Sequence, residues 1–156
     1  MHRGTPSEQQ SPFRLARYMS AFIVSVFLTG CDVEVPVEES IAGVDKVLEI
    51  RKQAIDNKDL TLYKSILLSD YSSSGVPYES VVDDIKRLFA TDEKIEFIYQ
   101  NAQPSIAMNS ARVTHMIEYH FSPSGKSAKI RETIHLRRID GEWFISSGIT
   151  LGLGMK

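Results

Sequence analysis

The stretch ETIHLRRIDGEWFISSGI, residues 132–149, contains the residue pair that decides the fold. Asp140-Gly141 is a pair that a two-residue type I′ turn favours, because both turn positions need a positive φ. On both sides of this pair apolar residues alternate with polar ones, which is typical of half-buried strands. The sequence therefore predicts an antiparallel hairpin. The strand pairs expected from this turn are Arg138–Trp143, Leu136–Ile145 and Ile134–Ser147.

Two segments upstream, residues 95–100 and 112–121, show the same alternation with a period of two. The loop SPSG at 122–125 follows the second of them and permits a two-residue turn. In either natural register, odd-numbered residues of the earlier strand lie opposite even-numbered residues of the later one. Both hairpins then turn their apolar side chains to the same face. The sequence predicts one curved antiparallel sheet of four or more strands.

Three helices are expected before this sheet. The first runs from Ile41 to about Asn57, with Ser40 as its N-cap, because apolar residues recur there at helical spacing. A short second helix follows Asp59, a candidate cap, and a third runs from Tyr78 to about Ala90. The segment SDYSSSGVP separates the second helix from the third, because serine, glycine and proline favour turns and loops. Helices followed by an antiparallel sheet predict an α+β domain with three N-terminal helices packed on one sheet face.

The segment QAIDNKDLTLYKSIL, residues 53–67, and the terminal hairpin together resemble the nuclear transport factor 2-like (NTF2-like) superfamily, which includes ketosteroid isomerase and SnoaL-type polyketide cyclases. The resemblance implies a cone-shaped domain over residues 41–150, followed by a tail, residues 151–156. It also implies a pocket between the helices and the concave face of the sheet, where some members perform acid or base chemistry. A cystatin-like or another helix-on-sheet fold stays open.

Four polar residues fall on the predicted inner face and are the candidate ligand-binding residues: Tyr99, His115, Tyr119 and Glu132. Glu132 lies opposite His115 in one hairpin register and opposite Ile117 in the other. A hydrogen-bonded His and Glu could serve in general acid or base catalysis, could line a ligand pocket, or could satisfy each other in the core. The sequence assigns no residue a catalytic role.

The first thirty residues predict a signal peptide, residues 1–30. Arg14 and Arg17 precede thirteen residues without formal charge. As a helix these would span roughly 20 Å, short of the about 30 Å of a hydrocarbon core. The segment LTGC, residues 28–31, resembles the lipobox of bacterial lipoproteins. The resemblance implies cleavage before Cys31 and acylation of Cys31, for example with palmitate.

The residues after Cys31 are acidic, and we expect residues 31–40 to be an extended tether that keeps the domain close to a membrane but clear of its headgroups. Asp32 resembles the signal that retains enterobacterial lipoproteins in the inner membrane. The expected location is therefore the cell envelope, with the domain outside the cytoplasm. Cys31 is the single cysteine of the chain, so an internal disulfide is excluded.

The sequence contains no motif that predicts a cofactor, a metal site or a catalytic nucleophile. A formal net charge of -2 gives no reason to expect a nucleic-acid partner. His120 and His135 fall on the outer sheet face without ligand spacing for zinc. Phe144 also points outward and suggests a homodimer through that face.

These observations predict a membrane-anchored lipoprotein whose domain binds a small apolar ligand or an envelope protein without catalysis. The alternative is an isomerase- or cyclase-like enzyme that uses the His–Glu pair, His115 and Glu132, in the cone.

Overall fold

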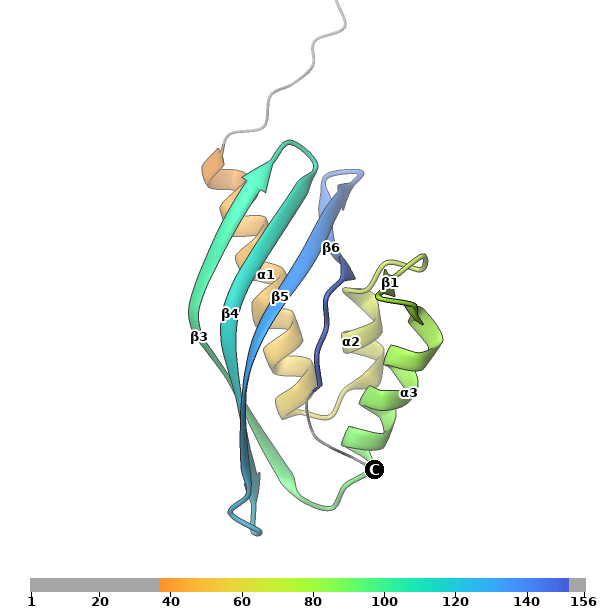
Figure 1. Ribbon diagram of the computed structural model, residues 1–156, viewed down its shortest axis with the longest axis vertical. Helices are drawn as coiled ribbons and strands as arrows, with labels where there is room; N and C mark the ends of the chain where they lie inside the picture. The colour runs from red at the N-terminus through yellow and green to blue at the C-terminus, as the bar shows by residue number, and fades with distance from the viewer. Residues whose placement is uncertain (1–36, 152–156) are drawn as a thin grey trace, which may run out of the picture. The chain divides into compact units, whose positions relative to one another are not determined.

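The computed structural model describes residues 37–151, which form helices packed on a curved antiparallel sheet (Figure 1). The helices are α1 (Val37–Asp56), α2 (Leu60–Ser65) and α3 (Tyr78–Phe89). The strands are β1 (Ser72–Ser73), β2 (Val76–Pro77), β3 (Lys94–Ala107), β4 (Ser110–Ser122), β5 (Ser127–Ile139) and β6 (Glu142–Ser147). The four long strands pair in the order β3-β4-β5-β6. This is the predicted α+β architecture; the two-residue strands β1 and β2 form a separate small hairpin within the serine-rich break.

The hairpin of β5 and β6 has two of the three predicted pairs. Arg138 pairs with Trp143 and Leu136 with Ile145, as the Asp140-Gly141 turn requires. The third predicted pair, Ile134 with Ser147, is wrong: Ser147 faces His135, because the register shifts between His135 and Leu136. An irregularity of this kind interrupts the regular hydrogen-bond pairing and bends the strand locally. It occurs where the chain is about to leave the sheet.

The hairpin of β4 and β5 pairs odd residues of β4 with even residues of β5, as predicted. Of the two registers that the sequence left open, the structure has the one in which Glu132 lies directly opposite His115. The inner face of the sheet is accordingly buried under α1, with Val113, Ile117 and Ile134 fully buried. The register thus brings one carboxylate and one imidazole together inside an apolar core.

Helix α1 begins earlier than the sequence predicted. Its first residue is Val37, so residues 37–40, which we expected in the tether, are helical. Glu38 and Glu39 lie in the first turn, where negative charge is favourable at the positive end of the helix dipole. Ser40 is buried within the helix rather than at its start. By contrast, Asp59 caps α2 as predicted, and its side chain accepts a hydrogen bond from the Leu62 N–H at 2.9 Å.

The predictions for the signal peptide, for Cys31 and for most of the tail concern residues 1–36 and 152–156, which lie outside the described residues. Within residues 37–151, no helix is both long and apolar enough to cross a membrane.

Candidate functional site

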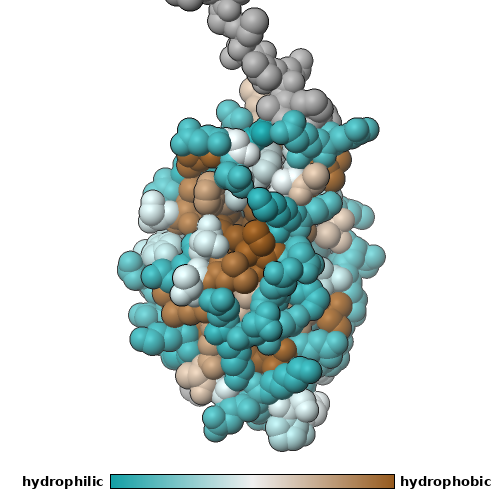
Figure 2. Space-filling view, turned by 180° about the vertical axis from the view of Figure 1, so that it is seen from behind, coloured by the Kyte–Doolittle hydropathy of each residue, from teal (hydrophilic) through white to brown (hydrophobic). Residues whose placement is uncertain are grey.

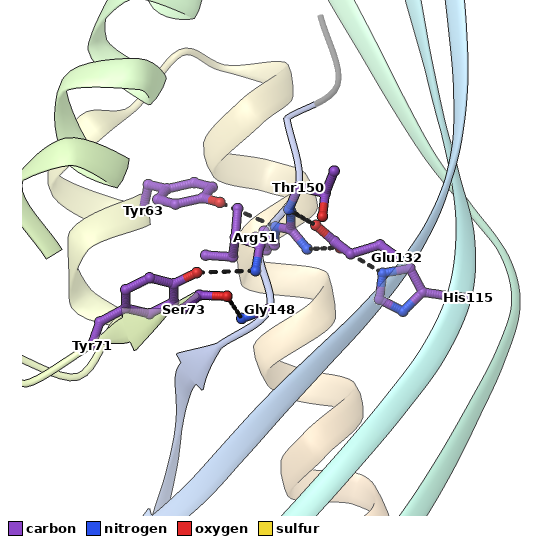
Figure 3. Close-up of polar contacts among 9 residues, drawn as sticks. Arg51, Tyr63, Tyr71, Ser73, His115, Glu132, Gly148 and Thr150 are labelled. Carbon is purple, nitrogen blue, oxygen red and sulfur yellow. Dashed lines mark hydrogen bonds and ion pairs between the residues drawn. The ribbon is translucent and has the colours of Figure 1, made fainter. Parts of the chain in front are cut away.

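The centre of the domain contains an ion pair between helix α1 and the sheet (Figure 3). Arg51 from α1 contacts Glu132 from β5 through both ends of its guanidinium. Nη1 donates to Oε2 at 2.6 Å and Nη2 donates to Oε1 at 3.0 Å. Both side chains are completely buried. This two-point geometry is the strongest form of an arginine–carboxylate contact, and it fixes the side chains of α1 and β5 relative to each other.

Two further donors complete the environment of the Glu132 carboxylate. His115 Nε2 donates to Oε2 at 2.8 Å, since an ionised carboxylate can only accept, and the Thr150 N–H donates to Oε1 at 2.6 Å. Arg51 Nε also donates to the Tyr63 hydroxyl at 3.2 Å. Each carboxylate oxygen of Glu132 therefore accepts two hydrogen bonds. We call Arg51, Tyr63, His115 and Glu132 the buried network.

The electrostatics of the pair keep both partners charged at neutral pH. Burial raises the pKa of Glu132, but the Arg51 charge and the hydrogen bonds from His115, Arg51 and Thr150 outweigh it and lower that pKa to about 2. Burial likewise lowers the pKa of Arg51, but the charge of Glu132, the neighbouring Tyr63 and Tyr99 and the hydrogen bond to Glu132 together more than reverse this effect, so that pKa is raised. A carboxylate with such a low pKa neither releases nor accepts a proton readily at neutral pH, so it is poorly suited to general acid or base catalysis.

The segment that follows β6, residues 148–151, crosses the space between the sheet and the helices (Figures 1 and 3). Side chains hold three successive backbone N–H groups of this C-terminal strap. Gly148 donates to Ser73 Oγ at 3.1 Å, Ile149 to the Tyr71 hydroxyl at 3.0 Å, and Thr150 to Glu132 as described above. Ile149 and Leu151 pack against the hydrophobic core. The strap and the buried network together occupy the region where the resemblance implies a pocket.

The tyrosine candidates lie beside the buried network without joining its hydrogen bonds. Tyr99 packs edge-on against the His115 ring, with 5.0 Å between centroids, and the rings of Tyr119 and Phe97 have centroids 4.9 Å apart. Burial raises the pKa of Tyr99 and of Tyr119. Within the described residues the hydroxyls of both tyrosines and Nδ1 of His115 are buried without a hydrogen-bond partner.

The described part of the chain has two surface hollows. The first, of about 470 Å³, lies between α1, α2 and the β5–β6 turn; its apolar lining includes Val47, Ile50 and Ile66. The second, of about 420 Å³, lies between the β1–β2 turn and the end of β6. None of the four predicted ligand-binding residues lines either hollow. From behind, the molecule shows apolar side chains gathered centrally within a polar surround (Figure 2).

The outer sheet face carries charges that pair with one another. Glu118 lies 3.7 Å from Lys129 and 3.4 Å from His120. Among residues 37–151, no group of three or more His, Cys, Asp or Glu side chains could hold a metal ion. His135 is exposed on this face, and His120 is partly exposed.

Arg51 is the member of the buried network that sequence reasoning missed. It lies four residues after Val47 and four before Ile55, both of which are buried, so it falls on the apolar stripe of α1. A charged residue on such a stripe was the available signal, because a buried charge requires a partner of opposite charge. Glu132, a carboxylate on the inner face of the predicted sheet, was the corresponding opposite charge.

No model of a protein family matches the sequence, and no curated protein matches it. Solved structures do match the fold. A protein assigned as a dehydratase of the NTF2-like family from Streptomyces avermitilis is 17% identical, with a TM-score of 0.59 over 72% of this chain and 95% of the other. A Nostoc punctiforme protein with a cystatin-like fold is 13% identical, with a TM-score of 0.60 over 74% of this chain and 95% of the other.

The structure of Bd1075 from Bdellovibrio bacteriovorus is also similar, at 17% identity and a TM-score of 0.62. This match covers 69% of the present chain but only 38% of Bd1075. At these identities the likeness establishes the fold and no activity. Helices packed on a curved four-stranded antiparallel sheet, together with these neighbours, show that residues 37–151 have the NTF2-like, cystatin-like fold.

Proposed function

We propose that this protein is a bacterial lipoprotein, anchored to an envelope membrane through acylated Cys31, whose NTF2-like domain binds a protein partner without catalysis. The anchor is supported by the signal-like segment and the LTGC sequence at residues 28–31. Acyl chains bury many methylenes, and two or three of them hold a protein firmly on a bilayer. The domain then works at the membrane surface.

The observation that carries the non-catalytic role is the occupancy of the Glu132 carboxylate. Four donors saturate its oxygens, and its pKa of about 2 keeps it ionised at neutral pH. An acid or base must instead offer a free position to its substrate and change its protonation state. Because one structural neighbour is assigned as a dehydratase, the isomerase- or cyclase-like enzyme stays as the second candidate function. The chemical reactivity of His115 distinguishes this enzyme from a non-catalytic binding domain.

A protein partner is favoured over a small apolar ligand because the interior already contains Arg51, Tyr63 and the C-terminal strap. The hollow beside α1 is open to the surface instead. Its lining combines apolar side chains with charged residues from α1 and the β5–β6 hairpin, namely Glu39, Lys46, Arg138 and Glu142. Protein-binding surfaces commonly combine apolar contacts with polar and charged ones.

The non-catalytic role predicts that diethyl pyrocarbonate modifies the histidines unequally. His135 is exposed and the His120 side chain is 42% exposed, so both should react in the native protein. His115 has a side chain that is 0% exposed and should react at least about tenfold more slowly, because reaction requires local opening. Peptide mapping by mass spectrometry gives the three rates, and urea-unfolded protein provides the control in which all three histidines react alike. Comparable rates in the native protein would mean that reagents reach the cone and would support the enzyme alternative.

The lipoprotein assignment predicts that mature protein begins at Cys31 and carries the mass of a diacylglyceryl group. Cys31→Ala should remain unprocessed or leave the membrane fraction, because the thiol that receives the lipid is lost. Intact-mass measurement and flotation on a density gradient check both outcomes, and Asp32→Asn is the matched control that keeps the thiol. A native chain that retains residues 1–30 with a free thiol would overturn the anchor.

A further inference from the structure

We infer that one end of the domain rests on the lipid bilayer, and this inference depends on the proposed anchoring through Cys31. The surface in question comprises residues 37–41 at the start of α1, the β3–β4 turn at residues 108–109 and the β5–β6 turn at residues 139–141. We call it the turn end. Figure 1 shows the start of α1 and both turns at the same end of the domain.

Contacts join the three parts of the turn end. The Arg138 N–H donates to the Asn109 carbonyl at 2.8 Å, which continues the β4–β5 pairing and brings Met108 to the level of Ile139. The Arg138 guanidinium lies 3.6 Å from the Glu39 carboxylate, which links the β5–β6 hairpin to the first turn of α1. The turn end is therefore one connected surface.

Exposed apolar side chains gather on this surface. Four large hydrophobic residues are exposed in the described part of the chain: Ile41, Val76, Met108 and Ile139. Three of them belong to the turn end, and Met108 is 92% exposed at the tip of a hairpin. A methionine that protrudes from a tight turn gains little from the fold itself, but it can enter the boundary between headgroups and acyl chains.

The short linker between Cys31 and α1 makes the lipid bilayer the partner that the turn end contacts. Because α1 begins at Val37, only residues 32–36 separate it from Cys31. Five extended residues span at most about 18 Å, so an acylated Cys31 holds the start of α1 close to the headgroups. Met108 and Ile139, at the same end as the start of α1, then lie nearer to the bilayer than the opposite end of the sheet.

The charges of the turn end favour an apolar contact rather than an electrostatic one. Glu39 in the turn end is paired with Arg138, and Glu142, which directly follows the β5–β6 turn, lies 3.7 Å from Lys46. Glu38 and Asp140 are exposed acids at the same end. Membrane binding through lysine or arginine clusters would require the opposite balance. We therefore expect the contact to form on zwitterionic lipid and to gain nothing from anionic lipid.

The test uses the mature lipoprotein reconstituted in phosphatidylcholine vesicles. Acylation blocks Cys31, so Met108→Cys provides a single free thiol for a fluorescent label. Lys126→Cys, exposed beside the β4–β5 turn at the other end of the sheet, is the matched control. A quencher carried near the headgroups on the lipid chain should reduce fluorescence at position 108 at least about twofold more than at position 126, because only the turn end enters the interface.

Equal quenching at the two positions, in protein that floats with the vesicles, would overturn the docking and leave the anchor intact. Stronger quenching at 108 only when anionic lipid is added would also overturn it, because the contact would then be electrostatic. If the protein lacks the diacylglyceryl mass and does not float, the anchor itself is wrong and the inference fails with it. The three results are distinguishable in the same preparation.

Discussion

Glu132→Gln is expected to lower the free energy of unfolding by about 3–5 kcal/mol, because it leaves the buried Arg51 charge without its partner. A glutamine side chain has nearly the shape of a glutamate, so the loss reports charge and hydrogen bonding rather than volume. Arg51 is completely buried and has no bulk water to replace the lost carboxylate. Urea denaturation followed by circular dichroism measures the change.

A double variant keeps this prediction testable if the single variant unfolds. Arg51→Met with Glu132→Gln removes both charges, and apolar replacements of buried ion pairs are often well tolerated. We therefore expect the double variant to be more stable than Glu132→Gln alone. If the double variant loses the sum of the two single losses, the residues act independently, and the bidentate contact has no special role in stability.

The pH dependence of unfolding provides a control for the same interaction. The pKa of Glu132 is lowered from 4.5 to about 2 in the folded protein, so the unfolded chain binds this proton first on acidification. Stability from Glu132 is therefore complete above about pH 4.5, falls as the pH drops, and is lost below about pH 2. A shift of this size corresponds to about 3 kcal/mol. Glu132→Gln should remove this part of the acid sensitivity.

Gly148→Ala is expected to lower the free energy of unfolding by about 3 kcal/mol, because two unfavourable effects add at this position. Gly148 has a φ of 92°, a conformation that an L side chain rarely adopts. A Cβ built there would also overlap the Thr133 carbonyl oxygen, a backbone atom that cannot move aside. The glycine is what allows the C-terminal strap to pass directly over β5. Urea denaturation measures this loss as well.

Gly141→Ala is the matched control for Gly148→Ala. Gly141 has a similar φ of 88°, but a Cβ there would meet no atom within 4 Å. Its replacement should cost about 1 kcal/mol, the conformational part alone. Equal losses in the two variants would mean that the strap does not depend on close packing against β5. A loosened strap in Gly148→Ala should also increase the reactivity of His115 with diethyl pyrocarbonate, because Thr150 covers Glu132.

The elements of this fold were largely predictable because short-range chemistry specifies them. Asp140-Gly141 determined a turn and two strand pairs, and Asp59 determined the start of α2. The parity of apolar residues determined which side of the sheet is buried. One helix boundary was mispredicted, at the start of α1, and one strand pair, Ile134 with Ser147, was mispredicted in the β5–β6 hairpin. At both places tertiary contacts add to local propensity. The irregularity between His135 and Leu136 has no signal in the alternation of side chains.

The candidate site was predictable only in part. The sequence alone placed Tyr99, His115, Tyr119 and Glu132 on one face, because alternation along a strand is a local property. It could not choose between two hairpin registers, nor could it show that Arg51 reaches Glu132 across 81 positions of sequence. Only the packing of α1 and the strap on the sheet decided that the carboxylate is saturated. A buried charge is satisfied by whichever opposite charge the tertiary structure brings within hydrogen-bonding distance, and sequence spacing does not determine that distance.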